Sequence, residues 1–434
     1  PLVRDALPLP ALEPGGVARL ETAFLLGGAD RWSPARPALY VLRVSVTGRD
    51  DGDRLYTSFG LRHVAVDPRL AQVQLNGIPA SFTGVGLHDE RLEPLPGRGE
   101  EATGGHRITA VQELLAQLDR ARQVDAELIR AGHTPANPLL LMLADRLGFA
   151  VWEEIPLYHY TPLTFDIAMQ RGIPQQMLRE MALRDMNRPS VLFHGLANES
   201  TGTDERLAAL RTLHQVDRQV DGTRLTGQAS YGFAPDDPTH APLDVAGYTF
   251  YYGVFYREDA AIGTARALAE AHAAHPGKPL LILEFGRWAD DAGGPALQQR
   301  IFEETYAELD ARSVERGGYV AAAVWWALED FATMRPGIGV EHFGLFDAAG
   351  EPRPAAASAA RLFSAVAGEG VEQMIASEVE RASVAREPEA DLRLVGYLGF
   401  ALLFSIGLLG ITVAALTHRG GRATGTRSLR RGVR

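Results

Sequence analysis

The sequence predicts an α/β fold: a (β/α)8 TIM barrel, preceded by a partial β-sandwich and followed by a C-terminal transmembrane helix. Three patterns predict it. Residues 16–75 alternate apolar and polar side chains, residues 79–367 alternate short apolar runs with helical stretches, and residues 394–416 carry no charge. We expect five parts in order: a partial sandwich at 1–76, the barrel at 77–367, a linker or stalk at 368–391, the membrane helix at 392–417 and a basic tail at 418–434.

The N-terminal part indicates short strands at residues 39–46 and 61–66, with turn-forming residues such as 49–53 between them. Half a sandwich would leave an apolar face and strand edges uncovered. We therefore expect a further N-terminal domain or a partner chain to complete it. The chain starts at Pro1 without an initiator methionine or a leader, so we also expect that a preceding part is processed or missing.

The middle part carries eight candidate strands with helices between most of them. The candidate strands are residues 80–84, 127–130, 149–153, 191–197, 225–228, 245–248, 280–284 and 321–326. The clearest helical stretches are residues 177–186, 205–220 and 260–274. Eight strands separated by helices over about 290 residues match the usual size of a (β/α)8 barrel.

The uncharged run at residues 394–416 is long enough to cross a membrane, since about 20 apolar residues span a hydrocarbon core of about 30 Å. A buried globular helix is the alternative. The tail after it contains several arginines and no acidic residue, which predicts a cytoplasmic tail. The sequence thus indicates a single-pass protein of the cell membrane whose barrel is extracytoplasmic.

The composition excludes some kinds of chemistry and of partner. The chain has 434 residues and is 46% hydrophobic, enough for a sizeable core. It has no cysteine, which rules out disulfides, thiol nucleophiles and thiolate metal sites. The formal net charge is -11 although the tail is basic, so the rest of the chain is more acidic still, and nucleic acid is not an expected partner.

Two glutamates each end a short apolar run: Glu199 follows residues 190–198, and Glu284 follows residues 279–283. A carboxylate at the end of a buried strand is costly unless it has partners. In a parallel barrel the C-terminal ends of the strands meet at one face, so the two carboxylates are expected in one pocket. Most enzymes that cleave a glycosidic bond use a pair of carboxylates.

Several ordered motifs resemble glycoside hydrolase family 2, the β-galactosidase, β-glucuronidase and β-mannosidase group. They are Trp32-Ser-Pro with residues 37–40, Thr57-Ser-Phe-Gly-Leu-Arg62, Leu75-Asn-Gly77, Phe82-Thr-Gly-Val-Gly-Leu-His-Asp-Glu90, Arg130-Ala-Gly-His-Thr-Pro135, Asp185-Met-Asn-Arg-Pro-Ser190 and Asn198-Glu-Ser200. The resemblance covers roughly residues 30 to 365. It implies a TIM-barrel catalytic part and identifies the sandwich as part of an immunoglobulin-like domain, without the family's N-terminal jelly-roll domain.

The resemblance also implies roles for individual residues. Glu199 would be the general acid/base and Glu284 the nucleophile of a retaining double displacement, with carboxyl groups about 5 Å apart. The substrate-binding candidates are Asn198, which would bind the sugar 2-hydroxyl, His88, Asp89, Arg130, His133, Tyr251, which would contact the nucleophile, and Trp326, which would form an apolar sugar platform. The chemistry needs no cofactor. Some relatives bind Mg2+ or Na+ near the pocket, but no metal-ligand set is visible in this sequence.

Structural roles are the alternatives at several of these positions. Either glutamate alone could be an ion-pair partner of Arg130, and His133 could cap a loop. His88 and Asp89 could lie on a solvated loop, although residues 90–106 could also form a variable rim of the pocket.

Departures from the family pattern bear on activity. Thr249 stands where the family often has Asn, and Phe255 lacks the hydroxyl of the usual second aromatic residue. Glucuronidases carry an Asn-x-Lys pair where this chain has Glu341-His-Phe343, and an acid there would repel a uronate. The sequence therefore favours a membrane-anchored exo-β-glycosidase acting on a neutral terminal sugar, β-galactosidase-like or β-mannosidase-like. The alternative is a weakly active or inactive barrel that serves as a carbohydrate-binding or scaffold subunit of a cell-envelope complex.

Overall fold

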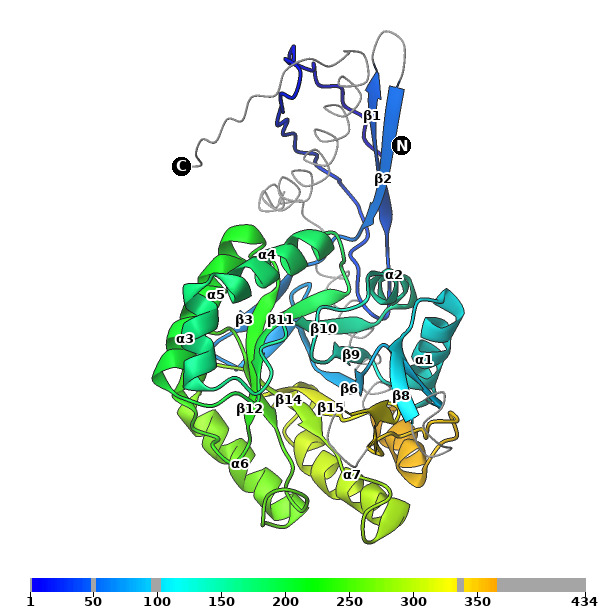
Figure 1. Ribbon diagram of the computed structural model, residues 1–434, viewed down its shortest axis with the longest axis vertical. Helices are drawn as coiled ribbons and strands as arrows, with labels where there is room; N and C mark the ends of the chain where they lie inside the picture. The colour runs from blue at the N-terminus through cyan, green and yellow to red at the C-terminus, as the bar shows by residue number, and fades with distance from the viewer. Residues whose placement is uncertain (1, 48–51, 95–102, 334–338, 365–434) are drawn as a thin grey trace, which may run out of the picture. The chain divides into compact units, whose positions relative to one another are not determined.

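The computed structural model describes residues 2–47, 52–94, 103–333 and 339–364 (Figure 1). The chain divides into two compact units. Among the described residues, 2–29 and Val41–Ser58 belong to one unit, and Asp30–Tyr40 and those from 59 to 364 belong to the other. In the first unit, β1 (Tyr40–Thr47) and β2 (Gly52–Phe59) form a two-stranded sheet whose side chains alternate between exposed and half-buried along most of its length.

The second unit contains a closed barrel of eight parallel strands (Figure 1). In chain order the strands are β6 (Phe82–Leu87), β9 (Leu128–Ala131), β10 (Ala150–Glu154), β11 (Val191–Asn198), β12 (Leu225–Tyr231), β13 (Ala246–Thr249), β14 (Leu280–Phe285) and β15 (Val320–Trp325). Each strand pairs with the next in sequence, and β15 closes the ring against β6. The predicted (β/α)8 barrel is confirmed, with all eight strands at the predicted places.

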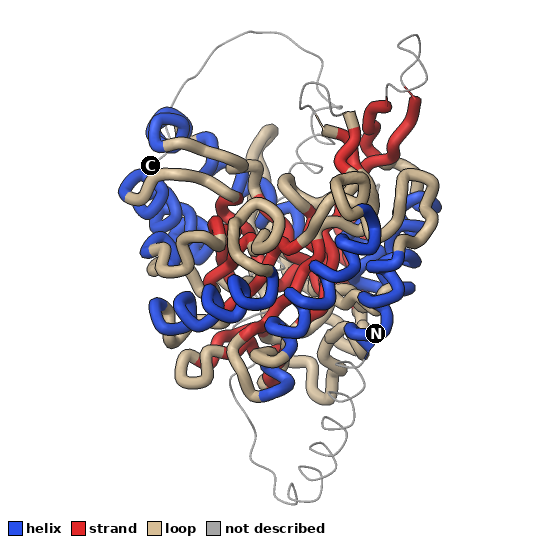
Figure 2. The backbone as a smooth tube through the Cα atoms, turned by 90° about the horizontal axis from the view of Figure 1, so that it is seen from below, coloured by secondary structure: helices blue, strands red, loops and turns tan. Residues whose placement is uncertain are grey.

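The strands are buried on both faces: helices lie around the outside of the barrel (Figure 2), and the residues that face its inside are buried as well. All six residues of β14, Leu-Leu-Ile-Leu-Glu-Phe, are buried, and so are all eight of β11. Such continuous apolar runs are typical of parallel barrels. A charged residue in them therefore needs partners, and Glu284 is one.

Seven helices with defined bounds lie among the described residues of this unit. They are α1 (Val111–Gln123), α2 (Pro138–Leu147), α3 (Pro162–Gln170), α4 (Ile173–Asp185), α5 (Asp204–Val220), α6 (Ala260–Ala274) and α7 (Gly294–Asp310). Their ends follow local chemistry: Asn137 caps the start of α2 and Asp259 that of α6 through side-chain hydrogen bonds. The predicted helix at 260–274 coincides with α6, whereas β12 and β13 are joined by only a 3-10 turn, η1 (Pro238–His240).

Shorter sheets complete this unit. They are β3 (Val64–Asp67) with β4 (Gln72–Leu75) and β5 (Ile78–Ala80); β7 (Glu90–Pro94) with β8 (Thr103–Arg107); and β16 (Phe331–Ala332) with β17 (Val340–Glu341). A second 3-10 turn, η2 (Val314–Arg316), precedes β15. The β7 and β8 pair coincides with the predicted rim segment.

The β3–β4–β5 sheet packs against the barrel rather than forming a separate core. Val64 and Val73 share an apolar cluster with Leu128 of β9. Next to the sheet in sequence, Arg62 donates to the carbonyls of Pro189 and Val191, at 3.2 and 2.8 Å. The compact unit therefore starts well before the predicted border between residues 76 and 77. The sandwich form of the N-terminal part, and the partner that would complete it, stay predictions.

None of the helices with defined positions is long and apolar enough to cross a membrane. The predicted linker, membrane helix at 392–417 and basic tail all lie outside the described residues. The predicted anchor and membrane location therefore stay predictions.

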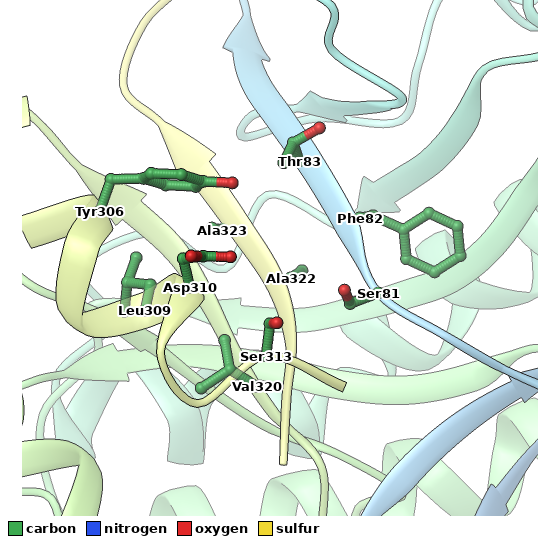
Figure 3. Close-up of a pocket in the computed structure, with 10 residues that line it drawn as sticks. All are labelled: Ser81, Phe82, Thr83, Tyr306, Leu309, Asp310, Ser313, Val320, Ala322 and Ala323. Atoms are coloured by element: carbon green, nitrogen blue, oxygen red, sulfur yellow. The ribbon is translucent and has the colours of Figure 1, made fainter. Parts of the chain in front are cut away.

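A small cavity lies between α7 and the starts of β6 and β15 (Figure 3). Its lining includes Ser81, Tyr306, Asp310 and Ser313. These residues are at the N-terminal ends of the strands, whereas both predicted catalytic glutamates are at C-terminal strand ends. The cavity is therefore not the predicted carbohydrate site, since polar sites in such barrels are built at the C-terminal face.

Candidate active site

The predicted catalytic residues come from the C-terminal ends of different strands. Glu199 directly follows β11, Glu284 is the penultimate residue of β14, and Arg130 lies near the end of β9. Tyr251 follows β13 by two residues, and Trp326 directly follows β15. The closed barrel brings these ends to one face, as the sequence predicted.

Arg130 is the centre of the site. Its side chain is fully buried, and Nη1 lies 2.5 Å from Oε1 of Glu284. Nη2 donates to Oδ1 of Asn198 at 2.7 Å and to Glu154 at 3.2 Å. Burial disfavours the charged guanidinium, yet the Glu154 and Glu284 carboxylates hold the pKa of Arg130 above its usual value. The Arg130 guanidinium therefore orients both Glu284, the candidate nucleophile, and Asn198, the residue before the candidate acid/base.

Glu154, at the end of β10, is a further carboxylate of the site, and its side chain is buried. It accepts from Nε1 of Trp152 at 2.7 Å, and its Oε1 lies 2.6 Å from Nδ1 of His133. Burial on its own would raise the pKa of the Glu154 carboxyl, but Arg130, His133 and Trp152 lower it to about 2. Glu154 thus stays ionised and fixes both Arg130 and His133.

Glu284 also accepts a hydrogen bond from Tyr251, with 2.7 Å between the phenol oxygen and Oε2. Burial, followed by the charges of Glu284 and Glu199, raises the pKa of Tyr251 well above its usual value. The phenol therefore keeps its proton and remains a donor. Both carboxylate oxygens of Glu284 are held, one by Arg130 and the other by Tyr251.

Glu199 is held by a residue of β13, which is two strands away from β11 in the barrel. The hydroxyl of Thr249 donates to Oε1 of Glu199 at 2.8 Å, and the backbone of Thr249 pairs in register with Glu284. Glu199 has a φ of +42°, a left-handed conformation that is uncommon for residues other than glycine. Thr249 thus connects the two carboxylates, through its side chain to one and its backbone to the other.

Asn198 presents an amide nitrogen to the site. Its Oδ1 accepts from Arg130, while Nδ2 is buried and has no hydrogen-bond partner among the residues with defined positions. A buried donor without a partner is costly, so it is a candidate for binding a ligand oxygen. This agrees with the predicted contact of Asn198 with a sugar hydroxyl.

Trp326 forms an apolar floor beside these groups. Its ring stacks on His133 with centroids 5.0 Å apart, and the Arg130 guanidinium carbon lies 5.5 Å from the ring centroid. Gly86 on β6 makes room for it, because a Cβ on this glycine would lie 2.3 Å from the indole ring. The predicted sugar platform therefore depends on a glycine in the first barrel strand.

The other predicted residues differ in position. The ring of His88 packs edge-on against Trp326, at 5.1 Å between centroids, and burial lowers its pKa to about 3. His88 is thus a neutral neighbour of the floor. Asp89 forms an ion pair with Arg107 of β8 at 2.8 Å, and within the described ranges no hydrogen bond joins it to the Arg130 network. The structure brings the other seven predicted residues together and leaves His88 and Asp89 at the edge.

Sequence reasoning missed three contributors. Glu154 obeys the same pattern as the predicted glutamates, a carboxylate ending an apolar run, and could have been found by it. Thr249 stands out in the sequence only as a departure from the family pattern, because its contact with Glu199 depends on how β11, β12 and β13 are aligned. Trp288 donates to Oε2 of Glu341 at 2.6 Å, and this pair joins segments 53 residues apart, which no local signal predicts.

The described ranges contain no group of three or more His, Cys, Asp or Glu residues arranged to hold a metal ion. The acidic residues of the site pair instead with Arg130, Tyr251 and Thr249.

This protein is therefore a (β/α)8 barrel with a polar site, which is built from paired carboxylates at the C-terminal ends of its strands. The chain belongs to glycosyl hydrolases family 2: the model of the TIM barrel domain of this family matches residues 66–367. The predicted family is thereby confirmed.

Individual proteins are also similar to this chain in sequence. A β-glucuronidase of Streptococcus agalactiae is 26% identical over 364 residues, covering 77% of this chain and 58% of that protein. A β-galactosidase of Thermoanaerobacterium thermosulfurigenes is 27% identical over 201 residues, covering 46% of this chain and 25% of that protein. The chain thus spans little more than half the length of the first of these relatives.

Solved structures show the same fold. A β-D-glucuronidase structure for Dictyoglomus thermophilum matches with a TM-score of 0.67 and 22% identity, covering 78% of this chain and 60% of that chain. A β-galacturonidase of the same family from Eisenbergiella tayi, bound to galacturonate, matches with a TM-score of 0.67 and 20% identity, covering the same shares of both chains.

Proposed function

We propose that this barrel is a retaining exo-β-glycosidase that hydrolyses a terminal sugar by double displacement. The observation that carries this proposal is that each of the two carboxylates is held by a different set of hydrogen-bond donors. Arg130 and Tyr251 hold Glu284, and Thr249 holds Glu199. Membership of glycosyl hydrolases family 2 supports it.

Glu284 is the proposed nucleophile. The donors on both of its oxygens hold the carboxylate and aim it at the anomeric carbon. Attack forms the glycosyl–enzyme ester as the bond from the anomeric carbon to the leaving oxygen breaks. Arg130 restrains the carboxylate throughout, because it is tied to Glu154 as well.

Glu199 is the proposed acid/base. It donates its proton to the leaving oxygen in the first step and removes a proton from water in the second, so that the anomeric configuration is retained. Nδ2 of Asn198 is free to donate to the sugar 2-hydroxyl, a contact that strengthens as positive charge develops on the sugar ring.

A neutral terminal sugar fits the wall next to Glu284. Tyr251 packs against Phe255 with ring centroids 4.8 Å apart, and Phe255 packs against Trp288 at 4.9 Å. Trp288 in turn bonds Glu341, and Phe343 is buried beside it. These five wall residues include an acid and no cation, which disfavours a uronate carboxylate. The relatives above include both a β-glucuronidase and a β-galactosidase, so glucuronides belong in the test.

The proposed location rests on sequence alone. The uncharged run at 394–416 and the arginines after it support a single-pass protein with an extracytoplasmic barrel. Protease treatment of intact cells, followed by an immunoblot against the barrel, tests it. Barrel cleavage in intact cells agrees with the proposal, and full protection until lysis contradicts it.

The second candidate is a sugar-binding or scaffold subunit with little activity. The observation that favours it is the loss of the hydroxyl at Phe255, beside the tyrosine that holds Glu284. A folded wild-type protein that binds a sugar but cleaves none would establish this candidate instead.

The deciding experiment measures hydrolysis of aryl β-galactosides, β-mannosides, β-glucosides and β-glucuronides by the full chain in detergent. In Glu284→Ala, turnover should vanish, and added azide should restore cleavage with formation of a glycosyl azide of inverted configuration. In Glu199→Ala, azide should yield the retained product, and good leaving groups should still be released in the first step. If wild type is folded and inactive on every glycoside, the proposal is wrong.

A further inference from the structure

Four rings form a partly exposed group outside the network of Arg130. We call Tyr158, His159, Tyr231 and Phe233 the outer ring cluster. Two of them follow β10 and two lie at or after the end of β12, on either side of Glu199 at the end of β11. Phe233 is 61% exposed and Tyr158 is 44% exposed, which is unusual for large apolar rings at the polar face of a barrel.

The outer ring cluster contacts the acid/base candidate directly. Nε2 of His159 lies 3.8 Å from Oε2 of Glu199, and Nδ1 of His159 lies 3.1 Å from the carbonyl oxygen of Glu199. The same Nδ1 lies 3.0 Å from the hydroxyl of Tyr231. The cluster is therefore anchored to the backbone and side chain of Glu199.

The rings also continue from the floor of the site outward. Trp326 stacks on His133, and His133 stacks on Tyr158 with centroids 4.8 Å apart and planes 8° from parallel. Tyr158 contacts His159 at 3.9 Å, and His159 stacks on Tyr231 at 6.4 Å. A line of ring contacts thus runs from the proposed sugar floor past Glu199.

Phe233 ends this line and is braced in place. It stacks on Tyr231 with centroids 5.1 Å apart, and Tyr256 meets it edge-on at 5.5 Å. The hydroxyl of Tyr256 donates to the carbonyl of Thr249, the residue that holds Glu199. An exposed side chain with ring contacts on two sides is held in one orientation and offers its remaining surface to a ligand.

We propose that the outer ring cluster binds the leaving group of the substrate by stacking, and that this leaving group carries a ring with a flat apolar face. The inference rests on the proposed function, because the group that protonates the leaving oxygen must lie on the side of the leaving group. Both an aromatic ring and the C–H face of a second sugar present such a surface. Phe233 supplies the stacking surface, and Tyr158 connects it to the sugar floor.

The test compares leaving groups on one and the same sugar. The substrates are a 4-nitrophenyl β-glycoside, a disaccharide and the glycosyl fluoride, whose leaving group has no ring. The variants are Phe233→Ala and Phe233→Trp, with Ile262→Ala as the control, since Ile262 is a 68% exposed apolar side chain on α6. Circular dichroism and the melting temperature check folding.

We expect Phe233→Ala to lower kcat/KM about three- to tenfold more for a ring-bearing leaving group than for fluoride, which is the range expected for one lost ring stack. Phe233→Trp should restore most of the loss, and Ile262→Ala should show no difference between substrates. A selective loss with the disaccharide would identify a sugar as the natural leaving group, and a loss with the aryl glycoside alone would identify an aromatic one.

Equal losses with fluoride and with both ring-bearing substrates would overturn the inference while leaving the proposed function intact. A folded wild type that cleaves none of the three substrates would instead contradict the proposed function. The two failures are thus distinguishable.

Discussion

Arg130 and Glu284 form a buried ion pair, with 2.5 Å between Nη1 and Oε1 and almost no solvent exposure of either side chain. The pair is not isolated, because Arg130 also contacts Glu154 and Asn198. Removing both charges of a buried pair can be nearly neutral, but removing one leaves an uncompensated charge in a dry environment. Arg130 is therefore important for both the stability of the barrel and the position of the proposed nucleophile.

Replacing Arg130 should affect both properties. We expect Arg130→Met to lower the free energy of unfolding by about 3–5 kcal/mol, because Glu284 and Glu154 lose their shared cation. We expect kcat/KM to fall by at least about a hundredfold, because the nucleophile is no longer oriented. Urea unfolding and steady-state kinetics measure these changes. The control Arg146→Met, at an exposed arginine of α2, should alter neither.

Thr249 should influence the pH dependence of the proposed reaction. Its hydroxyl donates to Oε1 of Glu199, and a hydrogen bond donated to a carboxylate favours the ionised form. Thr249→Val should therefore move the alkaline limb of the kcat/KM profile to higher pH, because Glu199 would keep its proton longer. Thr249→Ser, which retains the hydroxyl, should restore the profile. Identical limbs in wild type and Thr249→Val would show that the hydrogen bond does not tune Glu199.

Gly86 should determine the position of the Trp326 ring, the predicted sugar platform. A Cβ at this position would approach the Trp326 ring to 2.3 Å, so Gly86→Ala must displace either the indole ring or strand β6. We expect a rise in KM of about tenfold or more, since the stacking surface moves by a fraction of an ångström or more. Trp fluorescence and kinetics report the displacement. Gly27→Ala is the matched control, because an added Cβ there meets nothing within 4 Å.

Glu127, the residue just before β9, should make stability depend on pH. Burial, then the nearby carboxylates of Glu315 and Asp125, raises its pKa from 4.5 to about 7. Between these values the folded protein binds a proton that the unfolded chain has released, so stability should fall as the pH rises through this window. Glu127→Gln should reduce the fall in Tm between about pH 5 and about pH 8.

Part of the fall in Tm with rising pH, which we call the slope, should remain in Glu127→Gln. Burial, followed by the charge of Asp185, also raises the pKa of Glu153 to about 8. The exposed Glu180 of α4 provides the control, and Glu180→Gln should leave the slope as in wild type. A slope in Glu127→Gln equal to that of wild type would contradict the assignment of the titration to Glu127.

The strands and several helices of the barrel could be predicted from sequence because their signals are local. An apolar run such as residues 280–283 identifies a strand buried on both faces. The helical pattern of side chains at residues 260–274 identifies a helix with the same bounds as α6. Motifs such as Asn198-Glu-Ser200 also carried the family resemblance. Paired carboxylates at strand ends predicted the type of chemistry before any contact was known.

The sequence by itself determined the barrel, the family and the two carboxylates, since each depends on the order of residues along short segments. Only the tertiary structure decided how these residues act together. Arg130 reaches Glu284 across 154 positions, and Thr249 reaches Glu199 across 50, because closure of the barrel brings the C-terminal ends of strands that are not adjacent to one face. Such partners are set by where each strand lies in the ring and by how the strands are shifted along one another, and a linear pattern of side chains does not contain that geometry.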